Sequence, residues 1–200
     1  IVSGQGTIGL EIFKDIPDLD AIVVPIGGGG VIAGIAMAAK ELNPKIEIIG
    51  VEAQLYPSMY QAIHGLPPTS GGVSIAEGIA VKAPGVITKE IISRYVDDII
   101  LVDELSLESA VQTMVETGKL VVEGAGAAPL AAIRQQQNRF EGRRIGLIAC
   151  GANIDSRLLS SILLRGMIRL GRMARLRVEI SDQPGVLSRV TEKIGDVGGN

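Results

Sequence analysis

The chain has 200 residues, of which 46% are apolar and only 2% aromatic, and its formal net charge at pH 7 is −3. This length fits one domain of ordinary size with part of another around an aliphatic core, and the negative charge predicts no general attraction to nucleic acid or anionic membranes. No apolar run approaches the roughly 20 residues of a membrane-spanning helix. A single cysteine excludes an internal disulfide framework and indicates a reducing, cytoplasmic location.

Both ends of the sequence have the character of internal positions. The first residue is Ile1 rather than methionine, and Gly198, Gly199 and Asn200 end the chain without visible closure. We therefore expect a segment of a longer protein.

Strands and helices are expected to alternate over most of the chain. Thr7 is a good N-cap for a first helix that runs to Asp15. Apolar runs predict buried strands, and apolar residues at helical spacing predict helices, with Ser106 capping one and Asp155 or Ser156 another. The expected strands cover 21–24, 46–51, 99–102 and 145–149, and the expected helices cover 7–15, 31–42, 56–63, 85–94, 106–118, 124–137 and 156–170. This alternation is typical of an α/β domain with a parallel sheet and helices on both faces.

The pattern changes after Gly171. Residues 175–180 alternate polar and apolar, as a strand with one solvated face does, and residues 186–194 form an amphipathic helical pattern. We expect a first domain over residues 1–168, a linker over 169–174 and the start of a second, α+β domain over 175–200.

Four consecutive glycines, Gly27 to Gly30, follow the first expected strand and precede a helix. Glycine tolerates positive φ and has no Cβ, so backbone N–H groups can converge on a phosphate at the helix N-terminus without any lysine or arginine. Gly28, Gly30 and Ala33 also fit G-x-G-x-x-A, and Glu52 ends the next strand, as a dinucleotide site requires. The loop alone leaves both ligands open. The turn at Cys150 follows another strand end, so we expect it beside the loop.

Three segments in register, Ser3–Glu11, Gly27–Gly30 and Ile148–Asp155, resemble the threonine/serine dehydratases, and Val122–Gly126 fits as well. These are fold type II enzymes that use pyridoxal 5′-phosphate (PLP), with a parallel-sheet domain like that of the tryptophan synthase β subunit. The resemblance covers residues 1 to about 165 and disfavours the dinucleotide interpretation.

The resemblance implies a cofactor site. Gly27, Gly28, Gly29, Gly30 and the Val31 amide would cradle the PLP phosphate. Cys150 would face the pyridine nitrogen, where a neutral thiol makes the ring a weaker electron sink than an aspartate would. Two further residues, Glu123 and Gly78, are candidates for contacts with the cofactor ring and its edge.

The implied reaction is the deamination of L-threonine to 2-oxobutanoate and ammonia, in isoleucine biosynthesis or threonine catabolism, with L-serine as a second substrate. The family's Schiff-base lysine lies in a motif absent from this sequence, so we expect it upstream of Ile1 and no catalytic residue within this segment. The alternatives are an NAD(P)-dependent oxidoreductase, a serine racemase of the same fold and a non-catalytic amino-acid sensor.

The resemblance also bears on a metal site and on an effector site. Some relatives bind a divalent cation through a carboxylate at the position of Glu52 and a second acid six residues on, but Ser58 stands there, so we expect no metal site. Residues 178–187 resemble the opening of an ACT domain, a regulatory fold that pairs between subunits and binds an amino acid. A branched-chain amino acid is the implied effector, and the implied assembly is a homo-oligomer, a dimer or tetramer. The implied effector-binding residues are Asp182, Pro184, Gly185 and Asn200.

Overall fold

The computed structural model describes residues 1–199. The chain divides into two units, the first covering Ile1–Gly166 and the second beginning at Met167.

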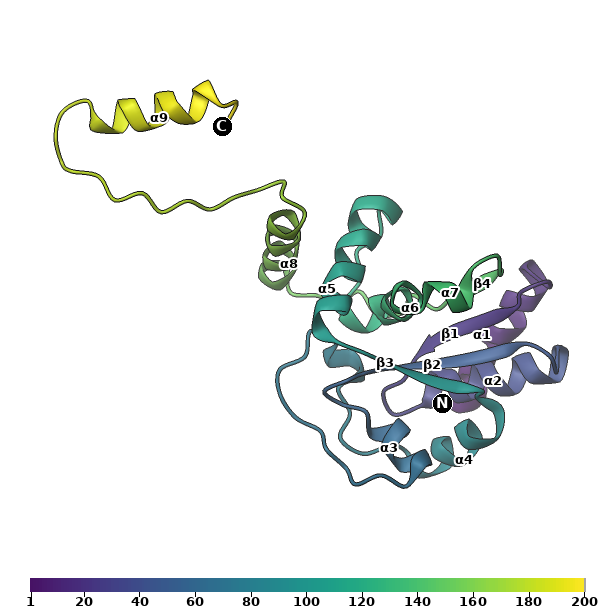
Figure 1. Cartoon of the computed structure of the whole chain (residues 1–200). Coiled ribbons are helices and arrows are strands. Elements are labelled where there is room, and N and C mark those ends of the chain that lie inside the picture. The colour runs from purple at the N-terminus through teal and green to yellow at the C-terminus, as the bar shows by residue number, and fades with distance from the viewer. Residues whose placement is uncertain (200) are drawn as a thin grey trace. The chain divides into compact units, whose positions relative to one another are not determined.

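A four-stranded parallel sheet forms the centre of the first unit (Figure 1). Its strand order is β3-β2-β1-β4, and each neighbouring pair is parallel, with Val23 opposite both Ile49 and Leu147. Because β1 is central and pairs with both β2 and β4, the segments that follow these strands meet at one edge of the sheet. The strands are β1 (Ala21–Pro25), β2 (Glu47–Ala53), β3 (Asp98–Val102) and β4 (Ile145–Leu147).

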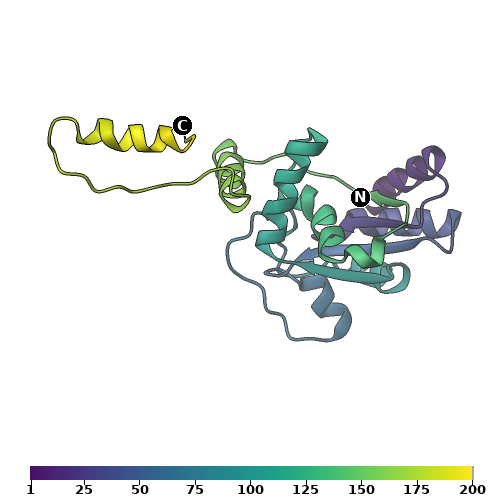
Figure 2. The ribbon, with the colours of Figure 1, turned by 45° about the horizontal axis from the view of Figure 1, so that its top comes forward.

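Helices cover both faces of the sheet (Figures 1 and 2). Alternate residues of β1 enter different cores: Ile22 and Val24 pack with α2, while Ala21 and Val23 pack with α5 and α6. This is the alternation that a strand with two covered faces requires. The first face carries α2 (Gly30–Leu42), α3 (Ser58–His64) and α4 (Val86–Tyr95), with α1 (Val2–Asp15) packed on α2; the second carries α5 (Glu104–Thr113), α6 (Gly124–Gln135) and α7 (Gln137–Phe140).

Two short irregular helices and most of α8 complete the first unit. A 3₁₀ turn covers Glu77–Ile79, a π-helical turn covers Met114–Gly118, and α8 (Ser156–Arg169) spans the division between the units. The carboxylate of Asp155 caps α8 by accepting from the N–H groups of Arg157 and Leu158, both at 3.0 Å. The predicted α/β parallel-sheet class is confirmed.

Two predicted helix starts are wrong. The first helix begins at Val2, and Thr7 lies inside it with its hydroxyl donating to the Gly4 carbonyl at 2.9 Å. The fifth helix is capped by Asp103, whose carboxylate accepts from the Ser106 N–H at 2.7 Å. Both Asp and Ser are good N-caps, and the earlier one ends the strand and starts the helix.

The predicted strand over residues 175–180 is absent, because the second unit contains no other strand among its described residues to pair with it. Among residues 167–199, the one complete helix is α9 (Val186–Asp196), which begins after Gly185 at φ 80°. No helix among residues 1–199 is both long and apolar enough to cross a membrane.

Candidate functional site

A hollow of about 200 Å³ lies past the carboxyl ends of β1 and β4. Its walls come from segments that are far apart in the sequence: the glycine loop, the 3₁₀ turn, the start of α6 and the turn after β4. Ligands of parallel α/β sheets bind at this edge. The lining residues are Pro25, Gly27, Gly28, Gly29, Gly30, Val31, Gly78, Ile79, Glu123, Ala125, Cys150 and Gly151.

The glycine loop that lines this hollow has free N–H donors. Within the described chain, the N–H groups of Gly27, Gly28 and Gly29 have no hydrogen-bond acceptor. The first N–H groups of α2, which begins at Gly30 after Gly29, also lack intrahelical partners, and the helix dipole is positive there. The loop that lines this hollow therefore has several free donors and the positive end of a helix dipole, and no lysine or arginine among the described residues belongs to the lining.

The loop needs glycine for steric reasons as well. Gly29 has φ 86°, and a Cβ there would lie 2.9 Å from the Met59 side chain. A Cβ on Gly27 would lie 3.2 Å from the Gly78 carbonyl oxygen. A Cβ on Gly28, by contrast, would meet nothing within 4 Å. The loop is thus packed tightly at Gly27 and Gly29 and open at Gly28, and such an opening between crowded glycines leaves room for a phosphate.

The opposite wall is built from close backbone approaches. A Cβ on Gly126 would lie 2.7 Å from the Cys150 carbonyl oxygen, and a Cβ on Gly151, at φ 96°, would collide with the Glu123 carboxylate. The Glu123 N–H donates to the Gly151 carbonyl at 3.1 Å. The start of α6 is therefore held against the turn that carries Cys150.

The Cys150 thiol is half-buried. Burial, together with the negative charge of Glu123, raises the pKa of this thiol above its ordinary value of 9.0. Cys150 is therefore a neutral hydrogen-bonding group at physiological pH rather than a thiolate nucleophile.

Glu52 occupies the position at which some relatives bind a divalent cation. It lies at the end of β2 and is 1% exposed. Its two carboxylate oxygens accept from the N–H groups of Met59 and Tyr60, each at 2.8 Å. Burial raises the pKa of Glu52 to about 7. Among residues 1–199 no group of three His, Cys, Asp or Glu side chains is arranged to hold a metal.

The structure brings together all the residues predicted for the cofactor site: Gly27 to Gly30, Val31, Gly78, Glu123 and Cys150 line the same hollow. Sequence reasoning missed Gly151, and it missed Thr88 of α4, whose hydroxyl donates to the Gly28 carbonyl. Gly151 could have been found from the sequence, because it directly follows Cys150 in the turn predicted to lie beside the glycine loop. No local pattern connects Thr88 with a loop 60 positions away.

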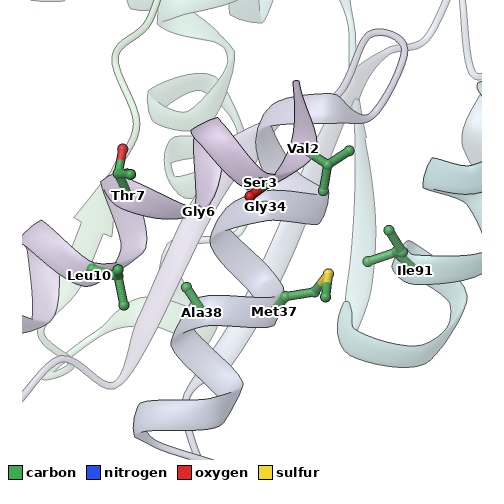
Figure 3. A pocket seen from close by; sticks show the side chains of 9 residues that line it. All are labelled: Val2, Ser3, Gly6, Thr7, Leu10, Gly34, Met37, Ala38 and Ile91. Carbon is green, nitrogen blue, oxygen red and sulfur yellow. The ribbon is translucent and has the colours of Figure 1, made fainter.

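A larger hollow, of about 460 Å³, lies elsewhere, between α1, α2 and α4. Its lining is apolar apart from the hydroxyls of Ser3 and Thr7, and Figure 3 shows Leu10, Met37 and Ile91 around it. It contains no glycine-loop residue and no ionisable side chain.

The second unit carries the residues predicted to bind an effector. Asp182, Pro184 and Gly185 are exposed in the turn before α9. Asn200 lies outside the described residues.

Comparisons with known proteins agree with this geometry. Residues 1–151 match the model of a family described as pyridoxal-phosphate dependent enzymes. An L-threonine ammonia-lyase of Geobacter sulfurreducens is 42% identical over 205 residues, covering 100% of this chain and 50% of the relative. This chain thus spans about half the length of the curated relatives it matches.

Solved structures give the same picture. The processed form of threonine deaminase isoform 2 from Solanum lycopersicum superposes with a TM-score of 0.75 at 33% identity, over 80% of this chain and 48% of that one. A maize serine racemase superposes with a TM-score of 0.72 at 34% identity, over 82% of this chain and 53% of that one.

Proposed function

This chain belongs to the pyridoxal-phosphate dependent enzymes, and from that premise we propose that the protein carrying it is a threonine ammonia-lyase. The reaction is the PLP-dependent deamination of L-threonine to 2-oxobutanoate and ammonia, with pyruvate and ammonia formed from L-serine; the water lost from the β-carbon is taken up again when ammonia is released by hydrolysis. The observation that carries the proposal is the set of unpaired glycine N–H groups in the loop that lines the hollow beyond β1. The choice of L-threonine as the substrate rests on the names of the similar proteins, an L-threonine ammonia-lyase and a threonine deaminase.

In this proposal the residues of the hollow have separate tasks. The N–H groups of Gly27 to Gly30 and of Val31 hold the phosphate of PLP at the start of α2. Bound PLP supplies a conjugated ring that withdraws electrons from the α-carbon of the amino acid. The Cys150 thiol offers the ring nitrogen a neutral partner, because burial and Glu123 keep it protonated. Glu123 and Gly78, which line the same hollow, would border the ring and its edge.

The proposal assigns the Schiff-base lysine to a position outside these 200 residues. No lysine lines the hollow among the described residues. The chain supplies phosphate binding and ring contacts, and it has no residue to which we give a covalent role.

Regulation is a separate part of the proposal. The segment after residue 175 is taken as the start of an ACT domain, preceded by a linker over residues 169–174. Asp182, Pro184, Gly185 and Asn200 would then bind a branched-chain amino acid between paired subunits of a cytoplasmic homo-oligomer. The exposed turn at Gly185 and the amphipathic α9 support this reading.

A serine racemase is the second candidate, favoured by the similarity to the maize enzyme. The product separates the two: L-threonine gives 2-oxobutanoate and ammonia in a lyase, whereas L-serine gives D-serine in a racemase. A protein that forms D-serine faster than keto acid would favour the racemase.

The test uses the complete native protein. Its absorbance in the visible region is recorded, the protein is reduced with borohydride, and the labelled peptide is mapped; turnover of L-threonine is then measured. A PLP absorbance band, a label on a lysine other than the seven positions 14, 40, 45, 82, 89, 119 and 193, and release of 2-oxobutanoate are expected. A colourless protein that binds NAD instead would overturn the proposal in favour of the oxidoreductase.

A further inference from the structure

The glycine loop is held by a side chain of α4. The Thr88 hydroxyl lies 2.6 Å from the Gly28 carbonyl oxygen and 3.1 Å from the Gly85 carbonyl oxygen. A hydroxyl donates one proton at a time, so the shorter contact is the stronger bond. The Gly28 carbonyl therefore points to α4.

This bond decides where a neighbouring N–H points. The Gly28 carbonyl and the Gly29 N–H belong to one planar peptide group, in which they point in opposite directions. Fixing the carbonyl against α4 directs the Gly29 N–H away from α4, and this N–H has no acceptor among residues 1–199. A peptide between two glycines rotates easily, and the opposite orientation would present a carbonyl oxygen to an anion in the hollow.

Other residues of α4 and its start serve the same contact. A Cβ on Gly85 would lie 2.6 Å from the Thr88 hydroxyl oxygen and 3.1 Å from the Gly28 oxygen, so glycine at this N-cap leaves room for the bond. One turn further, the Ile92 side chain would lie 2.8 Å from a Cβ on Gly29. The first half of α4 thus supports the loop from behind.

We propose that Thr88 is a positioning residue for phosphate binding: its hydroxyl fixes the Gly28–Gly29 peptide so that the Gly29 N–H is available to the phosphate of PLP. This inference rests on the proposed function, since it names a residue that prepares the proposed phosphate site. Thr88 acts through the loop backbone and does not need to touch the cofactor.

The test compares Thr88→Val with Thr88→Ser in the complete native protein freed of cofactor. Valine keeps the shape of threonine but removes the hydroxyl, and serine keeps the hydroxyl. Titration with PLP should show affinity about tenfold weaker for the valine variant and within about threefold of wild type for the serine variant. Titration with pyridoxal, which lacks the phosphate, should give equal affinities for all three proteins.

A phosphorus NMR spectrum of bound PLP reads the phosphate environment directly. We expect the signal to shift in Thr88→Val and to keep its wild-type position in Thr88→Ser. Gly85→Ala provides an independent test, because its methyl group displaces the Thr88 hydroxyl. This variant should weaken the binding of PLP but not the binding of pyridoxal, and it keeps the proposal testable even if Thr88→Val fails to fold.

The outcomes separate the two claims. If wild type takes up no PLP, the proposed function fails. If wild type binds PLP and Thr88→Val or Gly85→Ala matches it in affinity and phosphorus signal, the role of Thr88 is overturned while the proposed function stands. Equal weakening toward PLP and pyridoxal would also overturn it, since a general structural defect would then be the cause.

Discussion

Gly34 of α2 lies against the backbone of Gly6 in α1, so closely that a Cβ on Gly34 would be 2.7 Å from the Gly6 nitrogen. Real Cβ atoms do not approach backbone atoms to that distance, so the crossing of the two helices requires glycine at position 34. Because α2 begins directly at the glycine loop, this helix contact also fixes the element whose N-terminus faces the hollow.

Replacing Gly34 with alanine should therefore separate α1 from α2. We expect Gly34→Ala to lower the free energy of unfolding by about 1–3 kcal/mol, as overpacking in a close contact does. Gly4→Ala is the matched control, because it also lies in this helix pair and a Cβ there meets nothing within 4 Å. It should leave stability unchanged or raise it by up to about 1 kcal/mol. Denaturant unfolding measures the free energy of unfolding of both variants and of wild type. Equal stability of Gly34→Ala and Gly4→Ala would contradict the packing argument.

Gly29 combines backbone strain with crowding, and its replacement should damage the phosphate site. Its φ is 86°, and a Cβ there would crowd the side chains of Met59 and Ile92. Gly29→Ala should weaken PLP binding at least about tenfold. Gly65→Ala introduces comparable strain at φ 65° in open space and does not line the hollow, so its PLP affinity should equal wild type. Fluorescence titration measures both, and similar losses would mean that strain alone is responsible.

The parts of the site that sequence reasoning found are those with a local signature. Four glycines between a buried strand and a helix can be recognised from the sequence alone. Cys150 was predicted beside them because the segments that follow parallel strands meet at the carboxyl ends of those strands. Thr88 was not predictable, because its bond to Gly28 depends on how α4 packs on the first face of the sheet. The strand expected over residues 175–180 fails for the opposite reason: its local pattern is correct, but a strand requires a neighbour, and the second unit's described residues contain none.

Cys150 offers a test of the electrostatics of the hollow. Burial raises the pKa of its thiol, and the Glu123 carboxylate raises it further. Glu123→Gln should therefore lower this pKa and speed alkylation of Cys150 by iodoacetamide at mildly alkaline pH, where the thiolate fraction limits the rate. Glu77→Gln, a change at an exposed acid of the adjacent 3₁₀ turn, controls for loss of charge nearby. Since Cys150 is the single cysteine, mass spectrometry gives the rate directly. A rate unaffected by Glu123→Gln would show that burial alone protects the thiol.

Glu52 should make the stability of the fold depend on pH. Burial raises its pKa from 4.5 to about 7, even though the N–H groups of Tyr60 and Met59 favour the charged form. The folded chain therefore binds this proton more tightly than the unfolded chain does. The resulting stabilisation is fully present below pH 4.5 and is lost as the pH rises through about 7. A shift of this size corresponds to a few kcal/mol at most, of order 3 kcal/mol.

Glu52→Gln removes the titration while keeping one carbonyl acceptor for the two N–H donors. The variant resembles the protonated side chain, so its stability relative to wild type should improve as the pH is raised from about 5 to about 8. Other ionisable groups titrate in both proteins and cancel in this difference. Glu90→Gln, at an exposed position of α4, controls for the loss of one negative charge. Denaturant unfolding across the pH range is the measurement. If the difference between Glu52→Gln and wild type stays constant with pH, Glu52 is charged in the folded chain throughout, and its two backbone hydrogen bonds outweigh the cost of its burial.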